Sequence, residues 1–237
     1  MKLSHCKNMI ALLALGVGSS ASGAISLAFP VDSAFVGPTR LNLGNSLTFD
    51  FTVDGTGNVT VNATTTSANA NSIATVNGWD GSAGTVSDAA LFGTSFTMTA
   101  AGERRNNAGT VFDVVGISGD GLQSGGTIGI FGQNASVIDG ATLPNGNIER
   151  IVFSLSSGTV AATLDEFTFT GNGNSDPTVT SDSTSVNYFN NGVGAVNTSA
   201  DGLSFASGGF LRFEILDEEG AGDPAEGYRL NALTFDI

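Results

Sequence analysis

Residues 46–53 read SLTFDFTV, and this stretch decides the fold class. Its apolar residues alternate with threonine and aspartate, the period of two that is typical of a strand with one buried face. The turn sequence DGTGN follows at 54–58, and VTVNATT at 59–65 resumes the alternation. Two alternating runs around a short Asp-Gly turn predict a β-hairpin.

Similar short runs rich in Val, Ile, Phe and Thr recur along the chain between clusters of Gly, Asn, Asp and Ser. Further strands are expected at 95–99, 110–115, 127–131, 150–156, 160–170, 178–180, 185–189, 209–215 and 228–235. No stretch has a sustained helical period, although 87–92 suits one helical turn. The polar stretches 64–71 and 171–176 are as short as loops within one domain. We therefore expect a single all-β domain, a jelly-roll-like β-sandwich.

The first 24 residues predict an export signal peptide. Lys2 and Lys7 give a basic start, and the apolar run MIALLALGV at 9–17 has about half of the ~20 residues that a membrane-spanning helix needs. Ser22 and Ala24 suit the −3 and −1 positions of a signal peptidase site, so the domain is expected to cover 25–237. The protein is thus expected to be secreted, extracellular or at the cell surface, without a membrane span.

The composition that remains after the signal excludes several classes of chemistry. His5 and Cys6 are the only histidine and cysteine, and both lysines also lie in the signal. A Ser-His-Asp triad, a Schiff-base lysine, a P-loop lysine and an ordinary zinc site are therefore excluded. Six arginines stand against twenty-two acids, a net charge of −16. Such a chain repels nucleic acid and anionic lipid.

Oxygen-based chemistry remains open, and the acidic loop LDEEGAGDPAEG at 216–227 is its densest source. One interpretation is a calcium site, because calcium prefers oxygen ligands. The candidate ligands are Asp217, Glu219, Asp223 and Glu226. Their spacing does not match an EF-hand loop. The favoured interpretation is a solvated hairpin turn between strands that end at Ile215 and start at Gly227, with Arg212 and Arg229 facing one another near its base.

A second, scattered set of acids bears on glycoside hydrolysis, which needs two carboxyl groups ~5–10 Å apart across a cleft. The set comprises Asp113, Asp120, Asp139 and Glu149. Tyrosine chemistry could use Tyr188 or Tyr228. For sugar stacking the candidate is Trp79, in the turn-like sequence NGWDG, although a lone tryptophan also commonly caps a sandwich core. The alternating phenylalanines are interpreted as core packing.

Four segments in the second half of the chain resemble one known family. They are GIFGQNASVID at 129–139, ERIVFSL at 149–155, TVAATLDEF at 159–167 and YRLNALTF at 228–235. Their order is similar to that in secreted bacterial proteins of the PEP-CTERM, exosortase-sorted kind, over about residues 110–237. The hallmark tail of that family, Pro-Glu-Pro with an apolar span and a basic terminus, does not occur in the sequence. The resemblance implies an extracellular location and a released, unanchored form.

Three functions follow from these observations. The first is a non-enzymatic cell-surface, matrix or glycan-associated binding module whose partner is an extracellular polysaccharide or matrix. The second is a carboxylate-dependent enzyme that acts on polysaccharide, which the scarcity of Trp and Tyr disfavours. The third is a purely structural matrix protein. Calcium is the one cofactor considered, and the sequence leaves the oligomeric state open.

Overall fold

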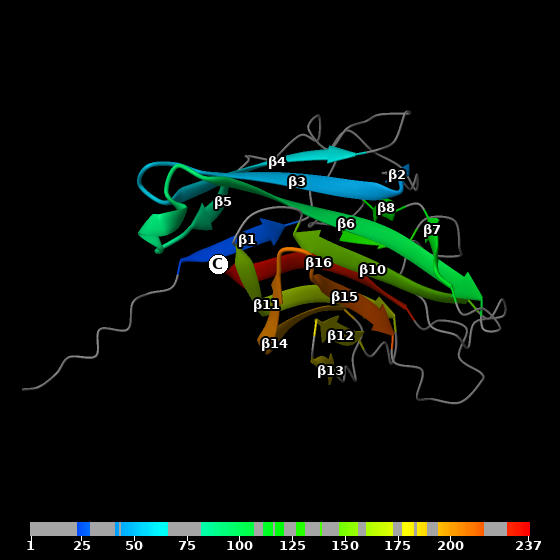
Figure 1. Ribbon diagram of the computed structural model, residues 1–237. Coiled ribbons are helices and arrows are strands. Elements are labelled where there is room, and N and C mark those ends of the chain that lie inside the picture. Colours follow the sequence, from blue (N-terminus) through cyan, green and yellow to red (C-terminus); the bar gives the residue numbers. More distant parts are fainter. Residues whose placement is uncertain are drawn as a thin grey trace, which may run out of the picture.

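The computed structural model describes residues 23–28, 41–42, 44–65, 82–106, 111–115, 117–120, 127–130, 138, 147–155, 160–172, 177–182, 184–188, 194–215 and 227–237. Within these ranges the protein is built from β-strands, which pair into one large curled sheet (Figure 1). All strand pairings of this sheet are antiparallel. The all-β prediction is confirmed.

One half of the curled sheet, here called the first layer, begins with the predicted hairpin. Its strands, in spatial order, are β4 (Asn58–Thr65), β3 (Ser46–Val53), β6 (Ser95–Asn106), β10 (Asn147–Leu155), β15 (Phe210–Ile215), β12 (Pro177–Ser181) and β13 (Ser185–Asn187). The short β7 (Asp113–Val115) pairs with the far end of β6. The hairpin of β3 and β4 is confirmed: Leu47 pairs with Thr65 at its open end, and Val53 pairs with Val59 beside the turn.

The other half, here called the second layer, lies below β3, β4 and β6 in Figure 1. It consists of β1 (Ala24–Ala28), β16 (Gly227–Asp236), β11 (Ala161–Asn172) and β14 (Gly194–Ala206). The strands β9 (Thr127–Ile130), β8 (Ile117–Asp120) and β2 (Leu41–Asn42) continue from β16. β16 is the central strand of this layer, because β11 borders one side of it and β1 and β9 share the other.

The sheet turns from one layer to the other at β5 (Ser82–Thr85), which pairs with β4 on one side and β1 on the other. Two glycines permit this close crossing. Gly84 has a φ of +122°, and a side chain there would run into the carbonyl oxygen of Ala24. A side chain at Gly23 would run into the backbone of Thr85 and Val86. The curl therefore depends on backbone packed against backbone.

Phenylalanine fills the space between the layers, as its alternation in the strands predicts. The largest fully buried side chains are Phe49, Phe51, Phe153, Phe167, Phe169, Phe205, Phe213, Phe235 and Tyr228. Several meet edge-on, including Phe153 with Phe213 at 5.7 Å and Phe205 with Phe235 at 6.1 Å between centroids. Edge-to-face contacts of this kind add to the stabilisation from burying the rings.

Two smaller predictions have clear outcomes. The helical turn expected at 87–92 is confirmed as a 3-10 helix, η2 (Ala89–Leu91), whose N-cap Asp88 accepts a hydrogen bond from the backbone N–H of Ala90 at 2.9 Å. No helix in the described part of the chain is long and apolar enough to cross a membrane. The jelly-roll connectivity remains a prediction, since the strand order establishes only a sheet curled into two layers.

The hairpin predicted around the acidic loop is wrong. Its strands end and start where expected, at Ile215 and Gly227. However, β15 pairs with β10 and β12 in the first layer, whereas β16 lies in the second. Arg212 is therefore opposite Val152 and Thr180, and Arg229 is opposite Thr170. Ile215 and Gly227 therefore lie in different layers, and β15 and β16 are not paired with one another.

Candidate functional site

The outer side of β4, β3 and β6 is covered by small hydroxyl and amide side chains, and we call it the hydroxyl face. Its nine residues are Thr60, Asn62 and Thr64 on β4, Thr48, Asp50 and Thr52 on β3, and Ser95, Thr97 and Thr99 on β6. They form three rows across the strands, because the ladder register aligns each triplet: Thr64–Thr48–Thr99, Asn62–Asp50–Thr97 and Thr60–Thr52–Ser95. The alternate residues of the same strands point into the core.

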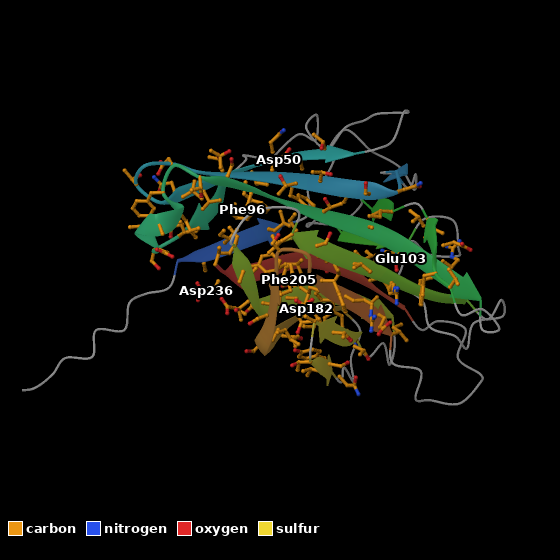
Figure 2. The ribbon with its side chains drawn as sticks, viewed as in Figure 1. Asp50, Phe96, Glu103, Asp182, Phe205 and Asp236 are labelled. Carbon is orange, nitrogen blue, oxygen red and sulfur yellow. The ribbon has the colours of Figure 1, made fainter. Side chains whose placement is uncertain are left out.

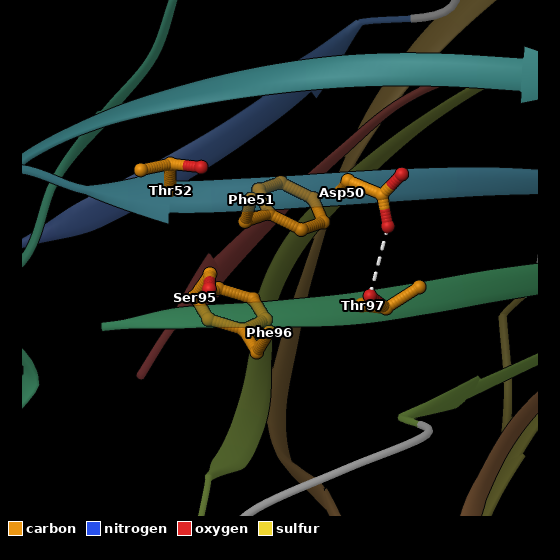
Figure 3. A pocket seen from close by; sticks show the side chains of 6 residues that line it. All are labelled: Asp50, Phe51, Thr52, Ser95, Phe96 and Thr97. Atoms are coloured by element: carbon orange, nitrogen blue, oxygen red, sulfur yellow. Dashed lines mark hydrogen bonds between the residues drawn. The ribbon is translucent and has the colours of Figure 1, made fainter.

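A groove of about 310 Å³ lies on this face between β3 and β6 (Figure 3). It is lined by Asp50, Phe51, Thr52, Ser95, Phe96 and Thr97. At one end Asp50 Oδ1 accepts a hydrogen bond of 2.8 Å from the Thr97 hydroxyl. At the other end Thr52 stands opposite Ser95. The rings of Phe51 and Phe96 stack on the buried side of the same strands, beneath the groove, with centroids 4.8 Å apart and planes 10° apart.

This lining is suited to polyhydroxylated ligands. Serine and threonine hydroxyls both donate and accept hydrogen bonds, and an ionised aspartate accepts several. Asp50 and Thr52 are exposed, so their oxygens can reach a ligand in solvent. The groove has one carboxylate among its described lining residues, whereas general acid–base hydrolysis of a glycoside requires two. The described lining can therefore exchange hydrogen bonds with hydroxyl-bearing ligands.

A contrasting charged region lies at the far end of β6, where Figure 2 places Glu103 well away from Asp50. Adjacent residues of opposite charge on β6 and β10 are aligned so that Arg104 faces Glu149 and Glu103 faces Arg150. Arg104 Nε donates to Glu149 Oε1 at 2.6 Å, and the Glu149 side chain is completely buried. Arg150 Nε donates to Glu103 Oε2, also at 2.6 Å.

The second of these pairs continues into a ladder of alternating charge on the outer surface. Arg150 is opposite Glu103 on one side and Glu214 on the other, and Arg212 Nη2 lies 3.0 Å from Glu214. The Arg150 guanidinium also lies over the ring of Phe112, 3.4 Å from its centroid. The three described acids Glu103, Glu149 and Glu214 each have an arginine partner, so their charges are locally neutralised and we interpret these pairs as structural.

Three of the four acids predicted for glycoside hydrolysis lie on described strands, and two of them, Asp113 and Glu149, flank Arg104 from the neighbouring strands. Glu149 is buried against Arg104, and Asp113 is exposed on β7, opposite Arg104 in the ladder. Asp120 ends β8. Asp139 lies outside the described residues, as do Trp79 and the candidate calcium ligands Asp217, Glu219, Asp223 and Glu226. In the described part of the chain no three His, Cys, Asp or Glu residues are arranged to hold a metal ion.

Both tyrosines pack as core residues. The Tyr228 hydroxyl donates to the backbone carbonyl of Glu214 at 3.1 Å, and the side chain is fully buried. Burial, and secondarily the charge of Glu214, raises the pKa of Tyr228 well above its ordinary value. Tyr188 meets Phe167 edge-on, with centroids 4.9 Å apart. Neither tyrosine lines the groove.

No family model, curated protein or solved structure matches the chain. The residues of the groove were also not singled out by the sequence. The sequence feature that could have identified them is the recurrence of threonine, serine or aspartate at every second position in 46–53 and 95–99. Only the pairing of β3 with β6 reveals that these positions form one surface.

Proposed function

We propose that the protein is a secreted, non-enzymatic β-sandwich that binds an extracellular polysaccharide through the hydroxyl face. The observation that carries the proposal is the groove on the outer side of β3 and β6, where Asp50, Thr52, Ser95 and Thr97 gather above the buried, stacked rings of Phe51 and Phe96. Sugar hydroxyls can exchange hydrogen bonds with each of these polar side chains. The nine positions of the face include one charged residue, so a sugar chain can approach it with little desolvation of charge.

The charge of the protein narrows the ligand to an uncharged polysaccharide. The net charge of −16 after signal removal repels uronate and sulfate polymers. The five arginines on described strands lie on β6, β10, β15 and β16, and none lines the groove. Since Asp50 adds a negative charge at the groove itself, an anionic sugar would be repelled locally as well.

The expected location supports this function. An export signal at 1–24 and the resemblance to secreted PEP-CTERM proteins over about 110–237 both favour an extracellular protein. Extracellular polysaccharide is the neutral, hydroxyl-rich polymer that such a protein would meet. The resemblance contributes the location, and the hydroxyl face contributes the chemistry.

A binding assay against a panel of neutral and anionic polysaccharides tests the proposal. The purified protein should be retained by at least one neutral polymer. Asp50→Ala or Thr97→Val should weaken that binding roughly tenfold, the effect of losing about 1.4 kcal/mol of hydrogen bonding. The matched control is Thr163→Val, which removes a 2.8 Å hydroxyl pair with Ser204 on the outside of the second layer.

Two results would contradict the proposal. One is the absence of binding to every neutral polymer, and the other is equal binding by the Asp50, Thr97 and Thr163 variants. The Trp79→Ala variant tests the other candidate for sugar binding, Trp79, independently of the groove. If Trp79→Ala alone abolishes binding, the ligand site is at Trp79 and the hydroxyl face is not involved.

A further inference from the structure

We propose that the export signal is cut between Ala21 and Ser22, so that Gly23 and Ala24 remain part of the secreted protein. The inference rests on the proposed export and revises the expected cut after Ala24. It comes from the junction between the two layers, where β1 lies between β5 and β16. Figure 1 shows β1 beside β16 in this position.

Gly23 packs tightly against β5 at the junction between the layers. It is buried, and its backbone N–H donates to the Ser87 hydroxyl at 3.4 Å. A β-carbon at this position would overlap the carbonyl oxygen of Thr85 and the α-carbon of Val86. Only glycine therefore lets the chain pass so close to β5. A residue that is discarded before folding would be under no such restriction from the folded domain.

Ala24 also contacts the junction, through β16 and through Gly84 of β5. It is the first residue of β1 and pairs with Asp236 of β16. Its carbonyl oxygen lies where a β-carbon on Gly84 would be, and Gly84 holds a φ of +122° that other residues rarely adopt. The backbone of Gly84, which has no side chain, thus leaves room for the Ala24 carbonyl. Removing Ala24 would leave this conformation without its packing partner.

The sequence offers a suitable site three residues upstream of the expected one. Ser19 and Ala21 are small residues at the −3 and −1 positions of a cut before Ser22, as signal peptidase requires. A cut after Ala24 would instead place the new α-ammonium group on Ile25. That residue is completely buried and is paired with both Phe235 and Gly84. Placing a charge on a buried backbone is unfavourable.

The experiment is to export the full chain from a bacterial host and determine its N-terminus by intact mass and N-terminal sequencing. A protein that begins Ser22-Gly23-Ala24 is the expected result. A protein that begins at Ile25 overturns the inference but leaves export intact. A cell-bound chain that still carries Met1 overturns both the inference and the proposed export.

A pair of substitutions provides a second measurement. Ala21→Leu removes the small residue at the −1 position and should abolish the cut before Ser22. Ala24→Leu is the matched control, because the Ala24 side chain is exposed and the substitution leaves Ser19 and Ala21 unchanged. It should be processed at the wild-type bond. The reverse pattern, with Ala24→Leu blocking the cut and Ala21→Leu tolerated, would place the cut after Ala24.

Stability distinguishes the two products directly. Two chains can be purified, one starting at Ser22 and one starting at Ile25. The shorter chain loses the Gly23 hydrogen bond and the Ala24 pairing, so its melting temperature should be lower by roughly 4 °C or more. Equal melting temperatures would show that Gly23 and Ala24 contribute nothing to the fold and would remove the reason for the upstream cut.

Discussion

Phe167 meets Phe213 edge-on, with ring centroids 5.4 Å apart and ring planes at 70°. Phe167 belongs to β11 in the second layer and Phe213 to β15 in the first, so this contact joins the two layers. Phe213 also meets Phe153 of β10. The pair therefore lies where the layers are held together by aromatic packing.

Truncating this contact should be costly. Phe213→Ala is expected to lower the free energy of unfolding by about 3–5 kcal/mol, since it leaves a cavity against two aromatic rings. Urea denaturation measures the change. Phe210→Ala is the control, because Phe210 is on the same strand but only partly buried and should cost clearly less. Equal losses in the free energy of unfolding for the two variants would contradict a stabilising role for the contact between the layers.

The buried ion pair between β6 and β10 and the partly exposed ion pair within β15 should differ in the cost of breaking them. Arg104→Ala leaves the carboxylate of Glu149 buried and should destabilise by about 3–5 kcal/mol. Arg212→Ala removes the partner of the partly exposed Glu214, and loss of that ion pair should cost about 0–1 kcal/mol. The double variant Arg104→Met with Glu149→Leu should be more stable than Arg104→Ala. Chemical denaturation of all three tests this order.

The turn after β3 should make stability depend on pH in acid. Hydrogen bonds from the side chains of Asn58 and Thr56, and then from their backbone N–H groups, hold the pKa of Asp54 well below its ordinary value of 3.8. The stabilisation is complete above the unfolded-state value, near pH 4, and is lost as pH falls toward the lower folded-state pKa. Asp54→Ala should thus melt below the wild type at pH 7, and the gap should narrow below pH 4. A gap that is constant with pH would contradict this origin.

Glycine at the crossing between layers should be far less replaceable than glycine in an open turn. Gly84→Ala combines a disallowed φ with overlap of the Ala24 carbonyl, and it should destabilise by more than about 2 kcal/mol. Gly93→Ala has a similar positive φ of +74° but open space around it, and should cost only about 1 kcal/mol. Thermal unfolding of both variants compares them; a larger loss at Gly93 would refute the steric account.

Calcium can be tested by melting the protein with and without a chelator. The solvated-loop interpretation of 216–226 predicts an unchanged midpoint. A bound calcium ion present at a hundred times its dissociation constant would add about 2.7 kcal/mol of stability instead. If such a shift is found and is absent in a variant with Asp217→Asn and Glu219→Gln, the calcium interpretation of the loop replaces the solvated one.

Local structure could be predicted from the sequence wherever it depends on neighbouring residues. The alternation in 46–53 and the Asp-Gly turn gave the hairpin, and the bounds at Ile215 and Gly227 were also right. Pairing between distant strands could not be predicted. The alternation of apolar and polar residues indicates which face of a strand is buried, but it does not indicate which strand lies next to it. Glu149 illustrates the limit: it resembled a catalytic candidate until its register with Arg104 showed a buried ion pair.

The position of β1 has a consequence for the order of events in the cell. Ser26 and Thr234, 208 residues apart, share a hydroxyl contact of 3.2 Å on neighbouring strands. So large a sequence separation gives a high contact order, which makes folding slow. A ribosome must finish nearly the whole polypeptide before β1 can pair with β16. For the export proposed above, this delay would keep the newly made chain unfolded while it threads through a secretion channel.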